Sequence, residues 1–116
     1  MNNYPPKVSI IIATFNSEKT IKRCLESCLS QNYINKELII VDAKSNDNTM
    51  KIIKEFNSSN LFYFSEPDNG IYDAWNKAIK ISKGDWVCFI GSDDFWISND
   101  SITKLVEKID NKKINF

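Results

Sequence analysis

The chain has 116 residues, of which 42% are hydrophobic and 26% charged, and its fifteen basic side chains balance fifteen acidic ones. This length and composition are those of one ordinary globular domain. No stretch concentrates one sign of charge, so the chain lacks the basic stripe of a nucleic-acid-binding protein. It has no histidine and only three scattered glycines. Histidine-based acid–base chemistry, a P-loop and a G-x-G-x-x-G fingerprint are therefore excluded.

The location of the protein is inferred from two missing signals. Residues 1–6 lack the charged and apolar regions of a signal peptide, and the longest apolar runs are too short to span a bilayer. We therefore expect a cytoplasmic location. The three cysteines, Cys24, Cys28 and Cys88, give no metal-binding set and an odd number for disulfides, so we interpret them as reduced packing residues.

In the first half of the chain, the spacing of apolar residues changes from that of a strand to that of a helix and back. A strand is predicted at 8–13, a helix at about 17–31, a strand at 37–42 and a helix over about 49–56. Ser45 or Asn46 is the expected N-cap of the second helix, with Asp47 in its first turn.

The second half of the chain continues the same alternation. A strand is predicted at 61–65, a helix from Ile71 that Gly84 terminates, a strand at 86–90 and a last helix over about 102–109. Trp75 shares a helical stripe with apolar residues, and we interpret it as a core residue. Strands that alternate with helices in this way predict an α/β fold with a parallel sheet.

Parallel sheets of this kind bind ligands beyond the carboxyl ends of their strands. That rule selects the polar segments that follow the four predicted strands, at 14–16, 42–44, 66–68 and 91–94. Asp42 ends the second strand, where its carboxylate could accept hydrogen bonds from a base N–H or from ribose hydroxyls. The alternative interpretation of Asp42 is an ordinary loop residue or helix cap.

Two adjacent acids, Asp93 and Asp94, follow the fourth strand. Because two neighbouring negative charges repel, such a pair is favoured where a cation lies between it and a bound anion. Mg²⁺ and Mn²⁺ suit this arrangement, since they take one or two carboxylates together with substrate phosphate oxygens. The alternative is that the pair caps a turn or a short helix.

The segment after the third strand supplies further candidates. Asp68 and Gly70 belong to a turn, and Gly70 allows a backbone geometry that other residues resist. Asp73 and Asn76 lie three apart on the following helix and share a face. They could bind sugar hydroxyls or simply be solvated.

Four segments, in order and at matching spacing, resemble glycosyltransferase family 2, whose members have the GT-A fold. These segments are VSIIIATFN at 8–16, ELIIVDAKSNDNT at 37–49, SEPDNGIYDAWNK at 65–77 and KGDWVCFIGSDD at 83–94. The third is similar to a stretch of a polysaccharide-biosynthesis subgroup, and the fourth to the segment that carries the family's DxD-type metal site.

The resemblance implies a Rossmann-like GT-A nucleotide-binding half, with a parallel sheet of order 3-2-1-4 and residues 1–116 as a single domain. It implies an inverting glycosyltransferase that takes a sugar from a nucleotide-diphospho-sugar, with Mn²⁺ or Mg²⁺, to a polysaccharide or glycan acceptor. Carried over by position, Asp42 lies beside the nucleoside, Asp93 contacts ribose or metal, and Asp94 ligates the metal. The other expected substrate-binding residues are Ala13, Thr14, Phe15, Asn16, Asp68, Gly70, Asp73 and Asn76.

The resemblance also limits what this chain is expected to do alone. The family's catalytic base belongs to the acceptor-binding half, so we expect it beyond Phe116 and expect this fragment to be inactive. A UDP-sugar is the first expectation for the donor. Ala43 stands where the family often has a second acid that reads the base, so GDP- and dTDP-sugars stay open. The resemblance leaves room for peripheral membrane association of a full-length enzyme.

Two other classes of protein were weighed. A non-catalytic nucleotide-binding α/β domain fits the same pattern of strands and helices. A phospho-acceptor receiver domain fits poorly, because a receiver places its acid pair after the first strand, and here the pair Asp93–Asp94 follows the fourth.

Overall fold

The computed structural model describes residues 5–112, and their side chains as far as residue 109. Met1–Tyr4 and residues 113–116, including the Phe116 beyond which a catalytic base is expected, lie outside the described residues. The elements are β1 (Val8–Thr14), α1 (Ile21–Leu29), β2 (Lys36–Asp42), α2 (Thr49–Lys54), β3 (Leu61–Ser65), α3 (Ile71–Ile81), β4 (Trp86–Gly91) and α4 (Ser101–Lys112).

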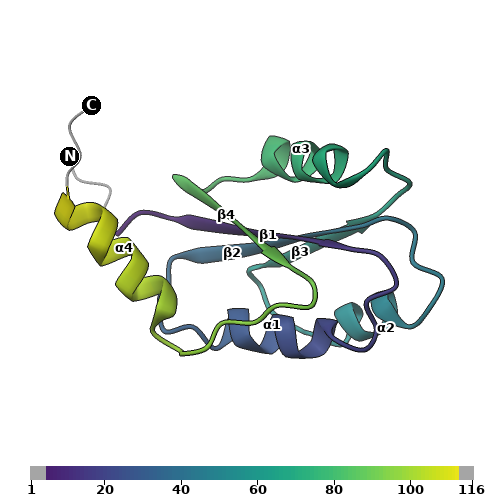
Figure 1. The fold of residues 1–116 in the computed structure, drawn as a ribbon, viewed down its shortest axis with the longest axis horizontal. Helices are drawn as coiled ribbons and strands as arrows, with labels where there is room; N and C mark the ends of the chain where they lie inside the picture. Colours follow the sequence, from purple (N-terminus) through teal and green to yellow (C-terminus); the bar gives the residue numbers. More distant parts are fainter. Residues whose placement is uncertain (1–4, 113–116) are drawn as a thin grey trace.

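The four strands form one parallel sheet in the order β3-β2-β1-β4, which confirms the predicted fold class and strand order. Helices α1 and α2 cover one face of the sheet and α3 covers the other (Figure 1). In the register, Ala13 pairs with Val41 on one side and with Gly91 on the other. The carboxyl ends of β1, β2 and β4 therefore meet at one edge, as expected.

The sheet is held by two apolar layers, because successive side chains of a strand point to opposite faces. Ile10 and Ile12 of β1 pack towards Leu25 of α1 in the larger layer. Ile11 packs on the other face, against Ala74 of α3, in the smaller one. All seven residues of β2 are buried, as predicted for a strand covered on both faces. Cys24 and Cys28 are buried, Cys88 is partly buried, and all three are free thiols.

The predicted start of α1 and the predicted N-cap of α2 were wrong. Helix α1 begins at Ile21 rather than near Ser17. Ser17 instead starts a turn, in which its carbonyl oxygen accepts the N–H groups of Thr20 and Ile21. The residue at the N-cap of α2 is Asn48, not Ser45 or Asn46, and the helix has no acidic residue in its first turn. Asp47 precedes the helix, where its carboxylate accepts the N–H of Thr49 at 3.0 Å.

Helix α3 contacts the sheet through its small residues. Ala74 and Ala78 are buried, whereas Ile71 and Ile79 of the predicted apolar stripe are 51% and 44% exposed. Trp75 is partly buried in the smaller layer and lies 4.6 Å from Phe89, ring centroid to centroid, which agrees with its interpretation as a core residue. The narrow contact follows from the alanines, which let the helix approach β1 and β2 closely.

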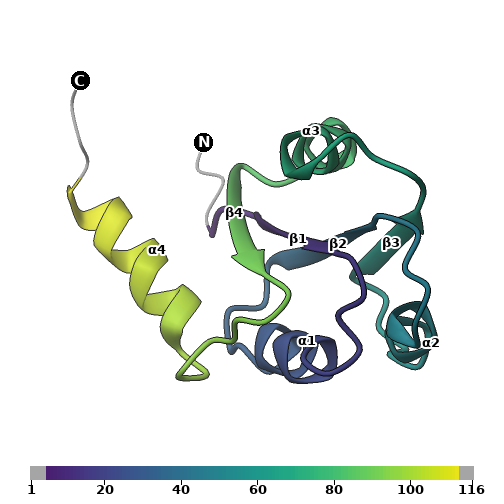
Figure 2. The same cartoon turned by 45° about the vertical axis from the view of Figure 1, so that its right-hand side comes forward.

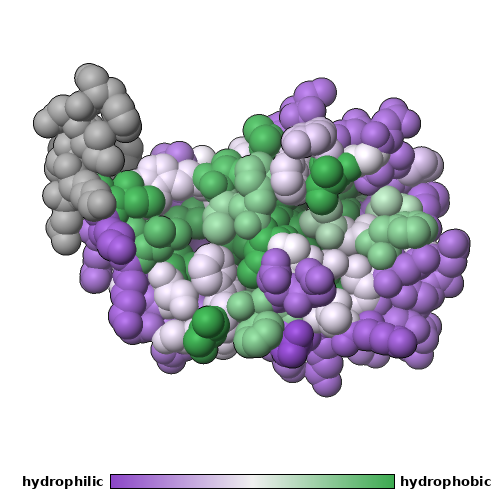
Figure 3. Space-filling model, in the orientation of Figure 1, coloured by the Kyte–Doolittle hydropathy of each residue, from purple (hydrophilic) through white to green (hydrophobic). Residues whose placement is uncertain are grey.

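Strand β4 forms an open edge of the sheet, since within residues 5–112 it pairs with β1 alone. Helix α4 stands to one side of this edge (Figure 2), and an apolar groove of about 390 Å³ lies between them. Val87 and Phe89 of β4 are 39% and 41% exposed. Figure 3 shows hydrophobic surface gathered over this part of the molecule. None of the helices in the described part of the chain is long and apolar enough to cross a membrane.

Gly84 does not end α3, whose C-cap is Ser82. It lies instead against Ser9, whose hydroxyl oxygen accepts the Gly84 N–H at 2.9 Å. The same hydroxyl donates to the buried carboxylate of Glu37 at 2.6 Å. A Cβ atom at Gly84 would lie 2.7 Å from the Ser9 backbone nitrogen and 2.9 Å from the Trp86 carbonyl oxygen. Glycine is therefore required here by close backbone approach.

We expect Gly84→Ala to lower the free energy of unfolding by about 1–3 kcal/mol, the usual cost of overpacking. The matched control is Gly91→Ala, where the three atoms nearest to the added Cβ belong to the side chains of Asp94 and Asp93, with carboxylate oxygens at 2.9 and 3.1 Å. Those side chains can swing away, so the control should unfold close to the wild type. Urea titration of the three proteins measures the difference, and equal midpoints for all three would contradict it.

Candidate functional site

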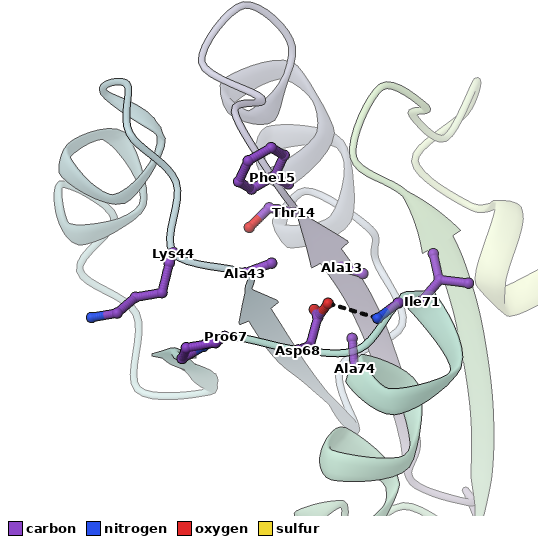
Figure 4. A pocket seen from close by; sticks show the side chains of 10 residues that line it. Ala13, Thr14, Phe15, Ala43, Lys44, Pro67, Asp68, Ile71 and Ala74 are labelled. Carbon is purple, nitrogen blue, oxygen red and sulfur yellow. Dashed lines mark hydrogen bonds between the residues drawn. The ribbon is translucent and has the colours of Figure 1, made fainter.

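A pocket of about 470 Å³ opens at the carboxyl ends of β1, β2 and β3. Figure 4 shows the side chain of Phe15 on one side of it and those of Asp68 and Ile71 on the other, while the Lys44 side chain extends away from the other lining residues. We call it the main pocket, and its lining residues are Ala13, Thr14, Phe15, Ala43, Lys44, Pro67, Asp68, Gly70, Ile71 and Ala74.

Five of the predicted substrate-binding residues line the main pocket, namely Ala13, Thr14, Phe15, Asp68 and Gly70. Phe15 is 56% exposed although it is aromatic. Its ring therefore presents a flat apolar surface beside the polar groups of the neighbouring loops. Such a mixture of apolar lining and a few oriented polar groups is typical of small-molecule sites.

Asp42 lies beneath the main pocket and is fully buried. One carboxylate oxygen accepts the hydroxyls of Thr14 at 2.7 Å and Ser45 at 2.5 Å. The other accepts the Ser45 N–H and the Ser65 hydroxyl, both at 2.8 Å. Burial would raise the pKa of Asp42, but the hydrogen bonds from Ser45, Thr14 and Ser65 outweigh it and hold that pKa below its ordinary value. Asp42 is thus an ionised centre that joins β1, β2 and β3.

The loops after β1 and β2 are also joined directly. The Asn16 N–H donates to the Ser45 hydroxyl, and the Asn46 N–H donates to the Asn16 side-chain oxygen, both at 2.8 Å. Asn16 and Lys44 have left-handed backbones, with φ of 50° and 60°. Asparagine tolerates this conformation well and lysine less so, which marks Lys44 as a strained residue at the rim of the main pocket. Asn16 itself is outside the lining.

The loop between β3 and α3 forms the opposite wall. The Asp68 carboxylate accepts the Gly70 N–H at 3.0 Å, and Gly70 has a φ of 113°, which only glycine adopts easily. Lys77 pairs with Glu66 at 2.9 Å and donates to the Pro67 carbonyl oxygen at 2.9 Å. These contacts hold the loop in place over the pocket.

Asp73 and Asn76 are not brought to the main pocket with the other predicted residues. The Asp73 carboxylate accepts the Asn69 N–H at 3.0 Å and lies 3.3 Å from the Lys77 ammonium nitrogen. Asn76 is exposed. The face of α3 that does line the pocket carries Ile71 and Ala74. A helix that packs through alanines turns its polar positions outward, and this could not be read from the spacing of Asp73 and Asn76.

The acids Asp93 and Asp94 belong to a tight turn, Gly91–Asp94, which we call the acid turn. It is closed by a hydrogen bond from the Asp94 N–H to the Gly91 carbonyl oxygen at 3.0 Å. The hydroxyl of Ser92 lies 2.9 Å from that of Ser17, which ties the acid turn to the loop after β1. A smaller pocket of about 220 Å³ shares Ala13 and Ile71 with the main pocket and reaches Gly91. The acid turn therefore lies beside the main pocket.

The two carboxylates converge over Gly91. Oxygens of Asp94 and Asp93 occupy the space that a Cβ atom at this position would need, at 2.9 and 3.1 Å from it. No cluster of three or more acidic, cysteine or histidine side chains suited to a metal occurs within the described residues. Two carboxylates are nevertheless the set that Mg²⁺ typically takes from a protein when substrate phosphates complete its coordination. The residues present thus fit a hard divalent cation that binds together with a phosphate ligand.

Several lining residues were missed at the level of sequence. Ala43, Lys44, Pro67, Ile71 and Ala74 line the main pocket but were not among the predicted site residues. Ala43, Lys44 and Pro67 lie in the segments 42–44 and 66–68 that the strand-end rule selected, which was the available signal for them. Ile71 and Ala74 lie on α3, where the apolar spacing predicts packing and does not indicate a pocket. Two hydrogen-bond partners of Asp42 are the partly buried Ser45 and Ser65, and nothing in the sequence separates them from ordinary surface serines.

A parallel sheet with a pocket at the carboxyl ends of its strands is the arrangement of nucleotide-binding α/β domains. Residues 9–115 match the family described as glycosyl transferase family 2, and the chain belongs to this family. Its sheet and helices are those of the GT-A glycosyltransferases.

Individual relatives support the same assignment. The chain is 38% identical over 110 residues to the Escherichia coli UDP-Glc:α-D-GlcNAc-diphosphoundecaprenol β-1,3-glucosyltransferase WfaP, covering 94% of this chain and 43% of the relative. Among solved structures it is similar to S. aureus TarS (residues 1–349) in complex with UDP-GlcNAc, with 32% identity, a TM-score of 0.83, and coverage of 90% of this chain and 31% of the other.

A third similar protein is glucosyl-3-phosphoglycerate synthase from Mycobacterium tuberculosis, solved with Mn²⁺, UDP and glucosyl-3-phosphoglycerate. It is 25% identical, with a TM-score of 0.63, and the match covers 76% of this chain and 34% of that one. The chain thus spans less than half the length of each of these relatives.

Proposed function

We propose that this chain forms the nucleotide-sugar-binding half of an inverting glycosyltransferase, and that the nucleotide-diphospho-sugar occupies the main pocket. The observation that carries the proposal is the meeting of the loops after β1, β2 and β3 around one pocket, with the acid turn beside it. Support comes from TarS, which has the same fold at 32% identity and was solved with UDP-GlcNAc.

In this proposal the nucleoside lies between Phe15 and the β3–α3 loop, where Ala13, Thr14, Asp68 and Gly70 form the walls. Asn16 acts from behind, by fixing the loop that carries Phe15. Asp73 and Asn76 stay predicted sugar-binding residues, and they would have to reach the sugar from outside the main pocket. UDP is the first candidate for the nucleotide, with GDP and dTDP as alternatives, because Ala43 offers no acid to read the base.

Asp42 could contact the nucleoside only by exchanging one of its present partners. A carboxylate offers about four acceptor positions, and Thr14, Ser45 and Ser65 supply four hydrogen bonds to this one. We therefore propose that Asp42 acts mainly through Thr14 and Ser45, which it orients towards the bound ligand.

Asp94 and Asp93 would hold Mn²⁺ or Mg²⁺ against the diphosphate. When bound, such a cation neutralises the charge that develops on the departing diphosphate. In the described part of the chain, Asp93 and Asp94 have no basic partner within 4.0 Å. Because their adjacent negative charges repel, a bound cation would stabilise the pair. The binding of Mn²⁺ and UDP by the mycobacterial synthase supports the same pairing of metal and nucleotide.

We also propose where the acceptor and the general base come from. Relatives that are more than twice as long transfer sugar, and we propose that a longer polypeptide containing this half does so too, to a glycan acceptor at or near a membrane. The 116-residue chain is expected to bind the donor without transferring the sugar, because a base for the acceptor hydroxyl would come from the other half.

The test is a thermal melt with UDP, GDP or dTDP, each with and without Mn²⁺. A nucleotide present at about 100 times its dissociation constant should stabilise the fold by about 2.7 kcal/mol, and only when the metal is present. A nucleotide-binding domain without the glycosyltransferase site would instead bind equally well without metal. Melting curves that no nucleoside diphosphate shifts at millimolar concentration, even with Mn²⁺, would overturn the proposal for this chain.

A further inference from the structure

Helix α1 holds the backbone at the first residue of the acid turn and again just after the turn. At the first residue, the buried thiol of Cys24 donates to the Gly91 carbonyl oxygen at 3.6 Å. After the turn, the hydroxyl oxygen of Ser27 accepts the Trp96 backbone N–H at 3.0 Å. Cys24 and Ser27 are three residues apart and lie on one face of the helix. The acid turn is thus attached to α1 at its first residue and, through Trp96, two residues after its last one.

The attachment continues along the segment that follows the turn. The guanidinium of Arg23 lies 4.2 Å from the centre of the Phe95 ring. The Gln31 side-chain amide donates to the Ser98 carbonyl oxygen at 2.6 Å, and its oxygen accepts the Ile102 N–H at 2.9 Å. A single stretch of chain, 23–31, therefore fixes the backbone from Gly91 to Ile102.

The hydrogen-bonding groups of Cys24 and Ser27 match those of the backbone groups that they contact, the Gly91 carbonyl and the Trp96 N–H. The neighbouring Cys28, burial and the acids Asp94 and Asp93 all raise the pKa of the Cys24 thiol, so the thiol stays protonated and can donate to the Gly91 carbonyl. That carbonyl also accepts the Asp94 N–H, which makes it the fixed point of the turn. The Ser27 hydroxyl donates to the Cys24 carbonyl at 2.8 Å, which orients its lone pair towards Trp96.

We propose that Ser27 is a positioning residue for the cation site, because it holds the chain two residues after Asp94 and so fixes the direction of that carboxylate. This inference rests on the proposed function. Carboxylates that are held in place before the cation arrives bind it more tightly than mobile ones, since less conformational freedom is lost on binding. Loss of a group that orients a metal ligand typically weakens metal binding by about 10- to 100-fold.

The experiment compares Ser27→Ala, Ser27→Thr and Ser30→Ala with the wild-type 116-residue chain. Mn²⁺ affinity is measured by the electron paramagnetic resonance of free Mn²⁺ in the presence of UDP, and each metal-free protein is melted. We expect Ser27→Ala to bind Mn²⁺ about 10-fold more weakly, at the lower end of that range, and Ser27→Thr, which keeps the hydroxyl, to recover most of the affinity. Ser30→Ala is the matched control, because the Ser30 hydroxyl bonds only within the helix, to the Ser27 carbonyl, and its affinity should equal that of the wild type.

A lower melting temperature alone would indicate a structural role, so the Mn²⁺ affinity decides. Wild-type affinity in Ser27→Ala would overturn the inference, whatever happens to the melt, and so would weakened binding that Ser27→Thr fails to restore. If Ser27→Ala does not fold, Cys24→Ala removes the other anchor and is held to the same criterion. Failure of the proposed function looks different, because the wild type itself would then show no Mn²⁺-dependent UDP binding, and both proposals would fall.

Discussion

Asp94→Asn is expected to abolish metal-dependent nucleotide binding while leaving the fold intact. The substitution keeps the shape of the side chain and removes the charge that would hold a cation against the diphosphate. Because changes one shell further out already cost up to about 100-fold in metal affinity, we expect at least that loss here. Without metal the variant should melt at the wild-type temperature or slightly above it, since one of two adjacent charges is gone.

The measurement is a Mn²⁺-dependent UDP titration of the wild type and Asp94→Asn, with a melt of each protein without metal. Glu107→Gln is the matched control, because it makes the same change of charge at an exposed position of α4. It should bind like the wild type. If Asp94 acted only as a cap, asparagine would replace it well, and equal UDP affinity in Asp94→Asn would refute the metal role.

Asp42→Ala is expected to have the largest effect on stability. It would leave the hydroxyls of Thr14, Ser45 and Ser65 and the Ser45 N–H without their buried acceptor. Hydrogen bonds to a charged group contribute about 1.5–3 kcal/mol each, and some of these donors can find other partners. We therefore expect a loss of about 3–5 kcal/mol in the free energy of unfolding, the range of the most severe single substitutions. Asp68→Ala, which removes a carboxylate with one hydrogen bond to Gly70, should cost far less.

The pH dependence provides a separate check on Asp42. Its pKa is lower in the folded protein than in the unfolded chain, so the unfolded state takes up its proton first as the pH falls. The contribution of Asp42 is therefore complete above the unfolded value, about 3.9, and is lost as the pH drops through the folded value. In urea titrations at pH 7 and pH 3, the gap between wild type and Asp42→Asn should shrink at the lower pH. A constant gap would show that the charge of Asp42 does not contribute.

The sheet could be predicted from the sequence because burial on both faces leaves a clear pattern. The nearly continuous apolar run 8–13 and the apolar residues 38–41 predicted the central strands, and the alternation of elements predicted their parallel direction. Helix starts were harder to predict, since the local hydrogen bonds of Ser17 and Asp47 compete with the helix and are not visible in the spacing of apolar residues.

The candidate site was predicted in part. The rule that ligands bind beyond the carboxyl ends of strands selected Thr14, Phe15 and Asp68, and these residues line the main pocket. It could not tell that Asp42 lies under the pocket rather than in its wall, because both positions follow the same strand. Whether a side chain at a strand end points into a cleft or beneath it depends on the neighbouring loops, here on Ser45 and Ser65.

The burial of Asp42 separates two groups of residues at the pocket, which differ in how well they should tolerate substitution. One is Asp42 with its buried surroundings, and the other is the more exposed rim. Asp42 lies under the pocket and is buried with the core, so a substitution of Asp42 lowers the stability of the fold as well as changing the pocket. The side chains of the rim residues Ala43, Lys44 and Pro67 take no part in the hydrogen bonds that hold Asp42. Laboratory selection for a new donor nucleotide should therefore accumulate substitutions at the rim and leave Asp42 and its serine partners untouched. Under the proposed function, the residues that would recognise the sugar donor are therefore separate from the residues that hold the fold together.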